Sequence, residues 1–97
     1  MHVISIKSLR QFWELRPDSE QALKAWYHEA KAANWRNSAE LKQKYCNASI
    51  VDSERVVFNI CGNKYRLVVR INYGSQTLFI RFVGTHQEYD RIDAKGI

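Results

Sequence analysis

The sequence contains little of what builds disulfide-rich domains, linkers or membrane spans. In 97 residues it has two cysteines, one proline and four glycines. Cys46 and Cys61 match no zinc or disulfide-framework spacing, so we expect two free thiols in a reducing compartment. The apolar runs are only a few residues long, and the first residues lack the basic and apolar regions of a secretory signal. We therefore expect a cytoplasmic protein without membrane association.

The short motifs of several enzyme classes are also missing. The chain has no metal-ligand spacing, no glycine loop that would cradle a phosphate, and no evident pairing of a serine or cysteine with a histidine. These absences argue against a metalloenzyme, a nucleoside triphosphatase and a hydrolase of the triad type. We expect no metal and no cofactor.

Length and composition indicate a single globular domain over residues 1–97. Hydrophobic residues make up 45% of the chain and charged residues 26%, the balance of a folded domain with one modest core. The net charge is +5 and the isoelectric point is near 9.4. This excess suits nucleic acid, an acidic protein partner, or solubility alone. The distribution of the charges must decide between them.

The first half of the chain has helical periodicity after one short strand. Residues 3–6 predict a strand that adds to an edge of the sheet. Apolar positions from Leu9 onward predict an amphipathic helix that ends near Pro17. Asp18 has the character of an N-cap for a second, longer helix, and residues 37–40 carry the capping signature of a short third one.

The second half changes to the period of β-strands, over residues 56–60, 65–73 and 77–83. Gly62-Asn63 and Gly74-Ser75 separate these strands and suit two-residue hairpin turns, because glycine accepts positive φ. The turns predict apolar pairs on one buried face: Ile60–Tyr65, Phe58–Leu67, Val56–Val69, Ile71–Leu78, Val69–Ile80 and Leu67–Phe82. A slip of one residue would destroy this match. We predict an α+β fold, a three-stranded antiparallel meander covered by the two N-terminal helices.

The opposite face of this sheet is basic. It collects Arg55, Asn59, Lys64, Arg66, Arg70 and Arg81. In the predicted register Arg55 lies opposite Arg70, and like charges directly opposed are unfavourable. We therefore expect an anion there, whether an RNA phosphate, a carboxylate of the C-terminal segment or a partner. The alternative is a solvated face on which arginine stems cover apolar patches.

A short helix should begin directly after the last strand, because Thr85 and Glu88 form a capping box. His86 then lies in the first turn of this helix, and Tyr89 lies one turn later on nearly the same side. Each residue alone also has a structural interpretation, a solvated histidine and a packing tyrosine. Next to a basic sheet face, both residues also have a chemical interpretation, as groups that transfer protons.

RNA can be cleaved without a metal if a base takes the 2′-OH proton, a cation stabilises the phosphoryl oxygens, and an acid protonates the leaving 5′-oxygen. His86 and Tyr89 are our candidates for the proton transfers. Arg66 and Arg81 are our candidates for holding the phosphate.

Two segments in this part of the chain resemble the HigB family of mRNA interferase toxins. They read V-F-N-I-x-G-N-x-Y-R-L-V over residues 57–68 and F-I-R-F-V-G-T-H-x-E-Y-D over residues 79–90. The resemblance extends over nearly the whole chain and implies a RelE-like fold, a small sheet backed by two N-terminal helices. By position in the motif it implies a functional role for Arg66 and for the segment with His86, Glu88, Tyr89 and Asp90.

The resemblance further implies mRNA cleavage, often on the ribosome, neutralisation by a helix-turn-helix antitoxin of the HigA type, and binding of operator DNA only through that antitoxin. The expected catalytic residues are His86, Tyr89, Arg66 and Arg81, and the expected RNA-binding residues are Lys64, Arg70, Arg55 and Asn59. The alternative function is a non-catalytic RNA- or protein-binding module that uses the same basic face. Measured RNA cleavage separates the two.

Overall fold

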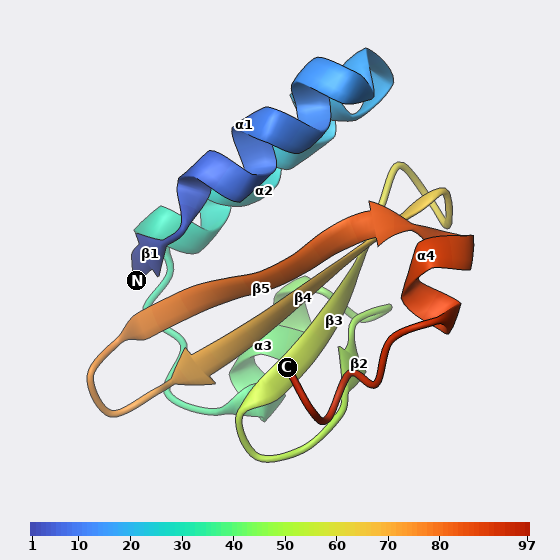
Figure 1. The fold of residues 1–97 in the computed structure, drawn as a ribbon. Coiled ribbons are helices and arrows are strands. Elements are labelled where there is room, and N and C mark those ends of the chain that lie inside the picture. The colour runs from blue at the N-terminus through green and yellow to red at the C-terminus, as the bar shows by residue number, and fades with distance from the viewer.

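The computed structural model describes residues 1–97 and has four α-helices and one five-stranded sheet (Figure 1). In chain order the elements are β1 (His2–Ile4), α1 (Ile6–Leu15), a 3-10 turn (Pro17–Ser19), α2 (Glu20–Ala32), α3 (Ser38–Lys44), β2 (Ser49–Ile50), β3 (Arg55–Ile60), β4 (Tyr65–Asn72), β5 (Thr77–Thr85) and α4 (His86–Asp90). The predicted α+β class and order of helices and strands are confirmed, and the two-residue strand β2 and the 3-10 turn were not expected. No helix has both the length and the apolar character needed to cross a membrane.

The sheet has the strand order β1-β5-β4-β3-β2. β1 pairs with β5 in parallel and forms an edge of the sheet, as expected, and every other pairing is antiparallel. The other edge is β2, which is only two residues long and joins β3. Two residues carry too little of a strand's periodicity for the sequence to indicate it.

The predicted register of the meander is confirmed for five of the six apolar pairs. Leu67–Phe82 is wrong, because a β-bulge shifts the register between β4 and β5: Val69 pairs with Ile80, but Val68 pairs with Phe82 and Leu67 with Val83. Arg81 is the extra residue. Val83 therefore packs against the core, and Phe82, opposite Val68, lies on the outer face in its place. Bulges re-aim side chains in this way, often beside functional sites.

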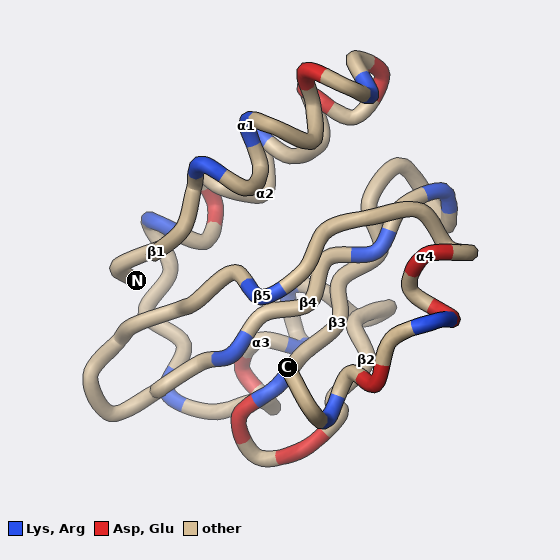
Figure 2. Tube along the Cα trace, viewed as in Figure 1, with Lys and Arg blue, Asp and Glu red and all other residues tan.

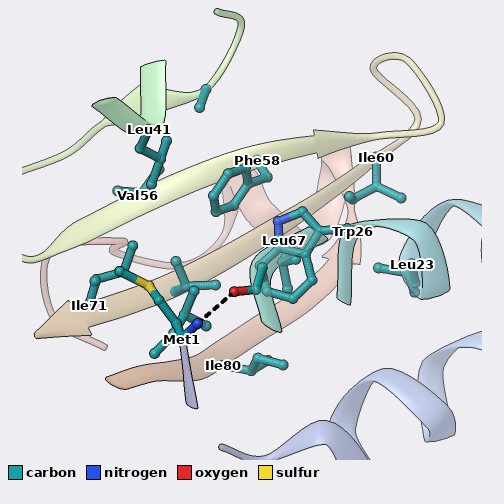
Figure 3. Close-up of a cluster of buried hydrophobic side chains, with 14 of the residues drawn as sticks. Met1, Leu23, Trp26, Leu41, Val56, Phe58, Ile60, Leu67, Ile71 and Ile80 are labelled. Atoms are coloured by element: carbon teal, nitrogen blue, oxygen red, sulfur yellow. Dashed lines mark hydrogen bonds between the residues drawn. The ribbon is translucent and has the colours of Figure 1, made fainter. Parts of the chain in front are cut away.

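The inner face of the sheet packs against α1, α2 and α3. Trp26 of α2 lies edge-on against Phe58 of β3, with ring centroids 5.4 Å apart, and Leu41 of α3 lies beside Val56 (Figure 3). Leu67, in the central strand, is fully buried. Arg70, by contrast, is exposed, so the alternation of inward apolar and outward basic positions on β4 is as predicted.

The expected helix cap at Asp18 is wrong. Pro17 ends α1 as predicted, but it begins a 3-10 turn, and α2 starts only at Glu20. The Asp18 carboxylate instead accepts a hydrogen bond from the Tyr65 hydroxyl at 2.7 Å and forms an ion pair with Lys64. These contacts join the start of α2 to the β3–β4 turn, and they hold the pKa of Asp18 below its usual value, chiefly through the hydrogen bond from Lys64.

The turn at Gly74 also differs from the prediction. Among the glycines only Gly62 has positive φ, and in the β4–β5 turn the residue with positive φ is Gln76, at 54°. The Gln76 side chain donates to the Tyr73 and Trp35 carbonyl oxygens at 2.9 and 2.7 Å. These contacts offset the strain of a non-glycine residue in this conformation, and the register beyond the turn is unaffected.

Candidate active site

The guanidinium of Arg66 is the centre of a cluster on the outer face of the sheet. Arg66 lies on β4, opposite Asn59 of β3 and Gly84 of β5. Its Nη2 is 2.8 Å from Nε2 of His86, and its Nη1 donates to Oδ1 of Asn59. The guanidinium carbon lies 5.6 Å from the ring centroid of Tyr89, within range of a cation–π contact. Four of the residues predicted from the sequence therefore come together here.

The position of His86 follows from the way the last strand ends. Thr85 forms the predicted capping box: its Oγ1 accepts from the Glu88 amide at 3.1 Å, and its own amide donates to Oε1 of Glu88 at 2.8 Å. The bond from the Thr85 backbone lowers the pKa of Glu88 and keeps it ionised. The capping box starts α4 at the end of β5, so the first side chain of the helix is placed beside Arg66.

His86 lies between the guanidinium of Arg66, a hydrogen-bond donor, and the carboxylate of Asp90, an acceptor. A guanidinium has no acceptor atom, so a hydrogen bond from Arg66 requires a lone pair on Nε2 of His86. The proton of the neutral ring is then on Nδ1, which lies 3.4 Å from Oδ2 of Asp90. Both the His86 and Asp90 side chains are about half exposed, at 48% and 61%. The two contacts favour one tautomer, with the Nε2 lone pair directed toward the basic face.

Arg66 retains an unused donor. Its Nε is buried and has no hydrogen-bond partner. A buried N–H without a partner is unfavourable, and such groups are often found where a ligand or water binds. The guanidinium is thus only partly satisfied by Asn59 and His86 in the free protein.

The other predicted cations differ in the hydrogen bonds and ion pairs that their side chains make. Arg81, at the bulge, is exposed and its side chain makes no hydrogen bond or ion pair. Arg70 lies opposite Arg55, as expected, and its Nε donates to Glu54 at 2.7 Å. Lys64 lies in the β3–β4 turn and is paired with Asp18 rather than placed next to Arg66.

The opposed arginines Arg55 and Arg70 are each bound by oxygen atoms of the chain itself. Figure 2 shows the acidic β2–β3 loop beside the basic start of β3. Arg55 Nη1 pairs with Asp52 at 3.1 Å, and its Nε donates to the carbonyl oxygen of Ile97 at 2.6 Å. The segment after α4 therefore crosses the outer face and reaches β3 (Figure 1). The anionic neighbours of this arginine pair are therefore Asp52 and Glu54 of the β2–β3 loop, which the sequence analysis did not name, and the C-terminal segment adds the oxygen of Ile97.

An open cleft of about 480 Å³ lies beside α4. It is lined by Arg16, Lys64, Tyr65, Thr85, His86, Gln87, Glu88 and Arg91. His86 thus faces both this cleft and the Arg66 cluster. Sequence analysis did not predict Arg16 or Arg91 as site residues, because only tertiary structure brings the end of α1 and the end of α4 together. The pairing of His86 with Asp90 could have been found from their i,i+4 spacing.

The two cysteines are both exposed and free, as expected, and they lie far apart in the sequence at Cys46 and Cys61. No group of three or more histidine, cysteine or acidic side chains converges as potential metal ligands.

Comparison with known proteins gives one consistent family. The model of the family described as HigB_toxin, the RelE-like toxic component of a toxin-antitoxin system, matches residues 19–92. The mRNA interferase toxin HigB of Escherichia coli strain K12 is 32% identical over 93 residues, which cover 93% of this chain and 88% of that protein. The mRNA interferase HigB of Shigella flexneri gives the same values. The mRNA interferase HigB of Escherichia coli O6:H1 is 23% identical over 94 residues, which cover 95% of this chain and 91% of that protein.

Proposed function

The chain belongs to the HigB family of RelE-like toxins of toxin–antitoxin systems, and from this premise we propose that it is a metal-independent endoribonuclease that cleaves mRNA. The observation that carries the proposal is the contact between Arg66 and Nε2 of His86, 2.8 Å apart. It places a cation that can bind a phosphate beside a ring nitrogen that can accept a proton. These are two of the three groups that metal-free RNA cleavage needs.

In the proposed reaction Arg66 leaves His86 and binds the scissile phosphate. The freed Nε2 of His86 takes the proton of the 2′-OH, and the 2′-oxygen attacks the phosphorus. The bond from phosphorus to the 5′-oxygen breaks, and Tyr89 gives its hydroxyl proton to that oxygen. The products are a 2′,3′-cyclic phosphate and a 5′-hydroxyl. Arg66 and Arg81 stabilise the charge on the phosphoryl oxygens.

Asp90 acts as a positioning residue for His86. Its carboxylate faces Nδ1 at 3.4 Å and favours the tautomer whose Nε2 is free to accept a proton. Asp90→Asn should lower kcat by about tenfold or more, as the loss of a base-orienting carboxylate does elsewhere, with KM unchanged. Asp93→Asn is the matched control, since Asp93 is another exposed carboxylate in the same segment. A change in KM alone would contradict this role.

The remaining predicted residues would bind the RNA strand on either side of the scissile phosphate. Lys64, Arg70 and Arg55 must first give up Asp18, Glu54 and Asp52, and Asn59 must release Arg66. The ion pairs of Lys64 and Arg70 are exposed and contribute little to stability, so their exchange for a phosphate costs little. Arg55 is mostly buried, at 19% exposure, and would also have to release Ile97.

The partners in this proposal are mRNA on the translating ribosome in the cytoplasm, and a cognate antitoxin of the HigA type. The antitoxin would cover the basic face or block access to it, and the complex would bind operator DNA through the antitoxin. The net charge of +5 suits both the RNA and an acidic antitoxin segment.

The test is induced expression in bacteria, with and without a neighbouring helix-turn-helix gene. Expression of the chain alone should arrest growth and shorten mRNAs, and co-expression of the antitoxin should restore both. Growth arrest with intact transcripts would contradict cleavage and would favour a non-catalytic binding module.

A further inference from the structure

The cleft beside α4 brings together three cations from separate parts of the chain. Arg16 comes from the end of α1, Lys64 from the β3–β4 turn and Arg91 from the end of α4. His86 lines the same cleft and also contacts Arg66 on the sheet. The cleft therefore continues the basic face past the candidate base, around the start of β4 and the end of β5 toward the end of α1.

Arg16 and Arg91 are available to bind a ligand. Both are exposed, and neither side chain makes a hydrogen bond or an ion pair. Surface arginines are often simply solvated, but here two unpaired ones converge on a hollow of about 480 Å³. Two arginines that can each present a fork of donors favour a phosphate over a small neutral ligand.

The carboxylates near the cleft do not neutralise it. Glu88 is the one carboxylate in the lining, and its Oε1 accepts from the Thr85 amide. Its pKa is lowered first by that backbone bond and also by the charges of Arg16 and Arg91. Asp18, outside the lining, pairs with Lys64. The lining keeps an excess of positive charge.

We propose that this cleft binds the RNA phosphate next to the scissile one, through Arg16 and Arg91. The inference rests on the proposed function, because it takes the scissile phosphate to lie on Arg66. When the scissile phosphate of the RNA lies on Arg66, the nucleotide that carries the attacking 2′-OH lies at His86. The next phosphate of that nucleotide then lies beyond His86, where the cleft is. Such contacts carry no base information, so the subsite accepts any nucleotide.

The experiment measures binding of a 2′-O-methyl RNA oligonucleotide, which cannot be cleaved, by fluorescence anisotropy at several salt concentrations. Arg16→Gln and Arg91→Gln should each weaken binding and lower the slope of log affinity against log salt by about 0.7, the value for one phosphate contact on a single strand. Arg10→Gln is the matched control, since Arg10 is an exposed arginine on the same helix away from the cleft. Thermal melting checks that all variants fold.

A cleavage assay separates the subsite from the reaction centre. On a defined mRNA with translating ribosomes, Arg16→Gln and Arg91→Gln should raise KM and change kcat little, whereas Arg66→Lys should lower kcat. If both variants bind RNA with the affinity and salt slope of the Arg10→Gln control, the subsite is refuted, even if the chain cleaves RNA. If the two variants bind an acidic antitoxin segment more weakly but bind RNA as before, the RNA subsite is refuted as well. If instead Arg66→Ala leaves RNA binding and cleavage unchanged, it is the proposed function that fails.

Discussion

Replacing His86 by glutamine should reduce RNA cleavage by about a hundredfold to ten-thousandfold, the usual effect of losing one acid–base group. Glutamine can still accept a hydrogen bond from Arg66, 2.8 Å from Nε2 in the present structure. It cannot take up a proton near neutral pH, so the substitution removes proton transfer while it preserves much of the contact. Single-turnover cleavage of an RNA substrate measures the effect.

Tyr89→Phe is the companion variant. It keeps the ring that Arg66 packs against at 5.6 Å and removes only the hydroxyl. If the hydroxyl is the general acid, this variant should also lose a large part of its activity, whereas a packing role predicts little change. Both variants should fold, since His86 and Tyr89 are not part of the buried core. Full activity in both would mean that the reaction centre lies elsewhere.

Replacing Arg66 by lysine should reduce turnover by about a hundredfold or more, because it removes a donor aimed at the charge that develops in the transition state. Lysine keeps the positive charge but has no planar fork, so it cannot contact the phosphate, Asn59 and His86 in the same arrangement. The loss should appear mainly in kcat and less in the affinity for RNA. Steady-state kinetics together with RNA binding measure the two effects separately.

Arg70 provides the control for this variant. It lies on the same strand and the same face, but its guanidinium pairs with Glu54 at 2.7 Å and touches no candidate catalytic residue. Arg70→Lys should leave turnover close to that of the unaltered chain, and Arg70→Ala should at most weaken RNA binding by about one phosphate contact. Equal losses in the Arg66 and Arg70 variants, with turnover retained, would instead indicate a binding module.

The register of the sheet could be predicted because side chains alternate with a period of two and both hairpin turns are short. The prediction failed at one place, Leu67–Phe82, where Arg81 is inserted as a bulge. A bulge leaves no clear pattern here, because Phe82 and Val83 are both apolar and either one fits the inner face. Asp18 was misjudged for a related reason. Its capping character was visible in the sequence, but its partners Lys64 and Tyr65 are brought to it only by the fold.

The cluster at Arg66 was more accessible to sequence reasoning than the cleft. The capping box at Thr85 indicated where α4 begins, and the register placed Arg66 opposite Asn59, so the approach of His86 to the basic face followed from local patterns. Arg16 is separated from His86 by most of the chain. No periodicity links the end of α1 to α4, and their proximity depends on how α1 packs against β5.

The central claim is that the 2′-OH of the RNA attacks its own phosphate under the action of His86 and Arg66. The chemistry of the new RNA ends tests it most directly, with the purified chain, translating ribosomes and a defined mRNA. We predict 2′,3′-cyclic phosphate and 5′-hydroxyl ends, absent when His86→Gln protein purified in the same way is used. Ends with a 3′-hydroxyl and a 5′-phosphate would contradict the claim, because they require an attacking water rather than the 2′-OH.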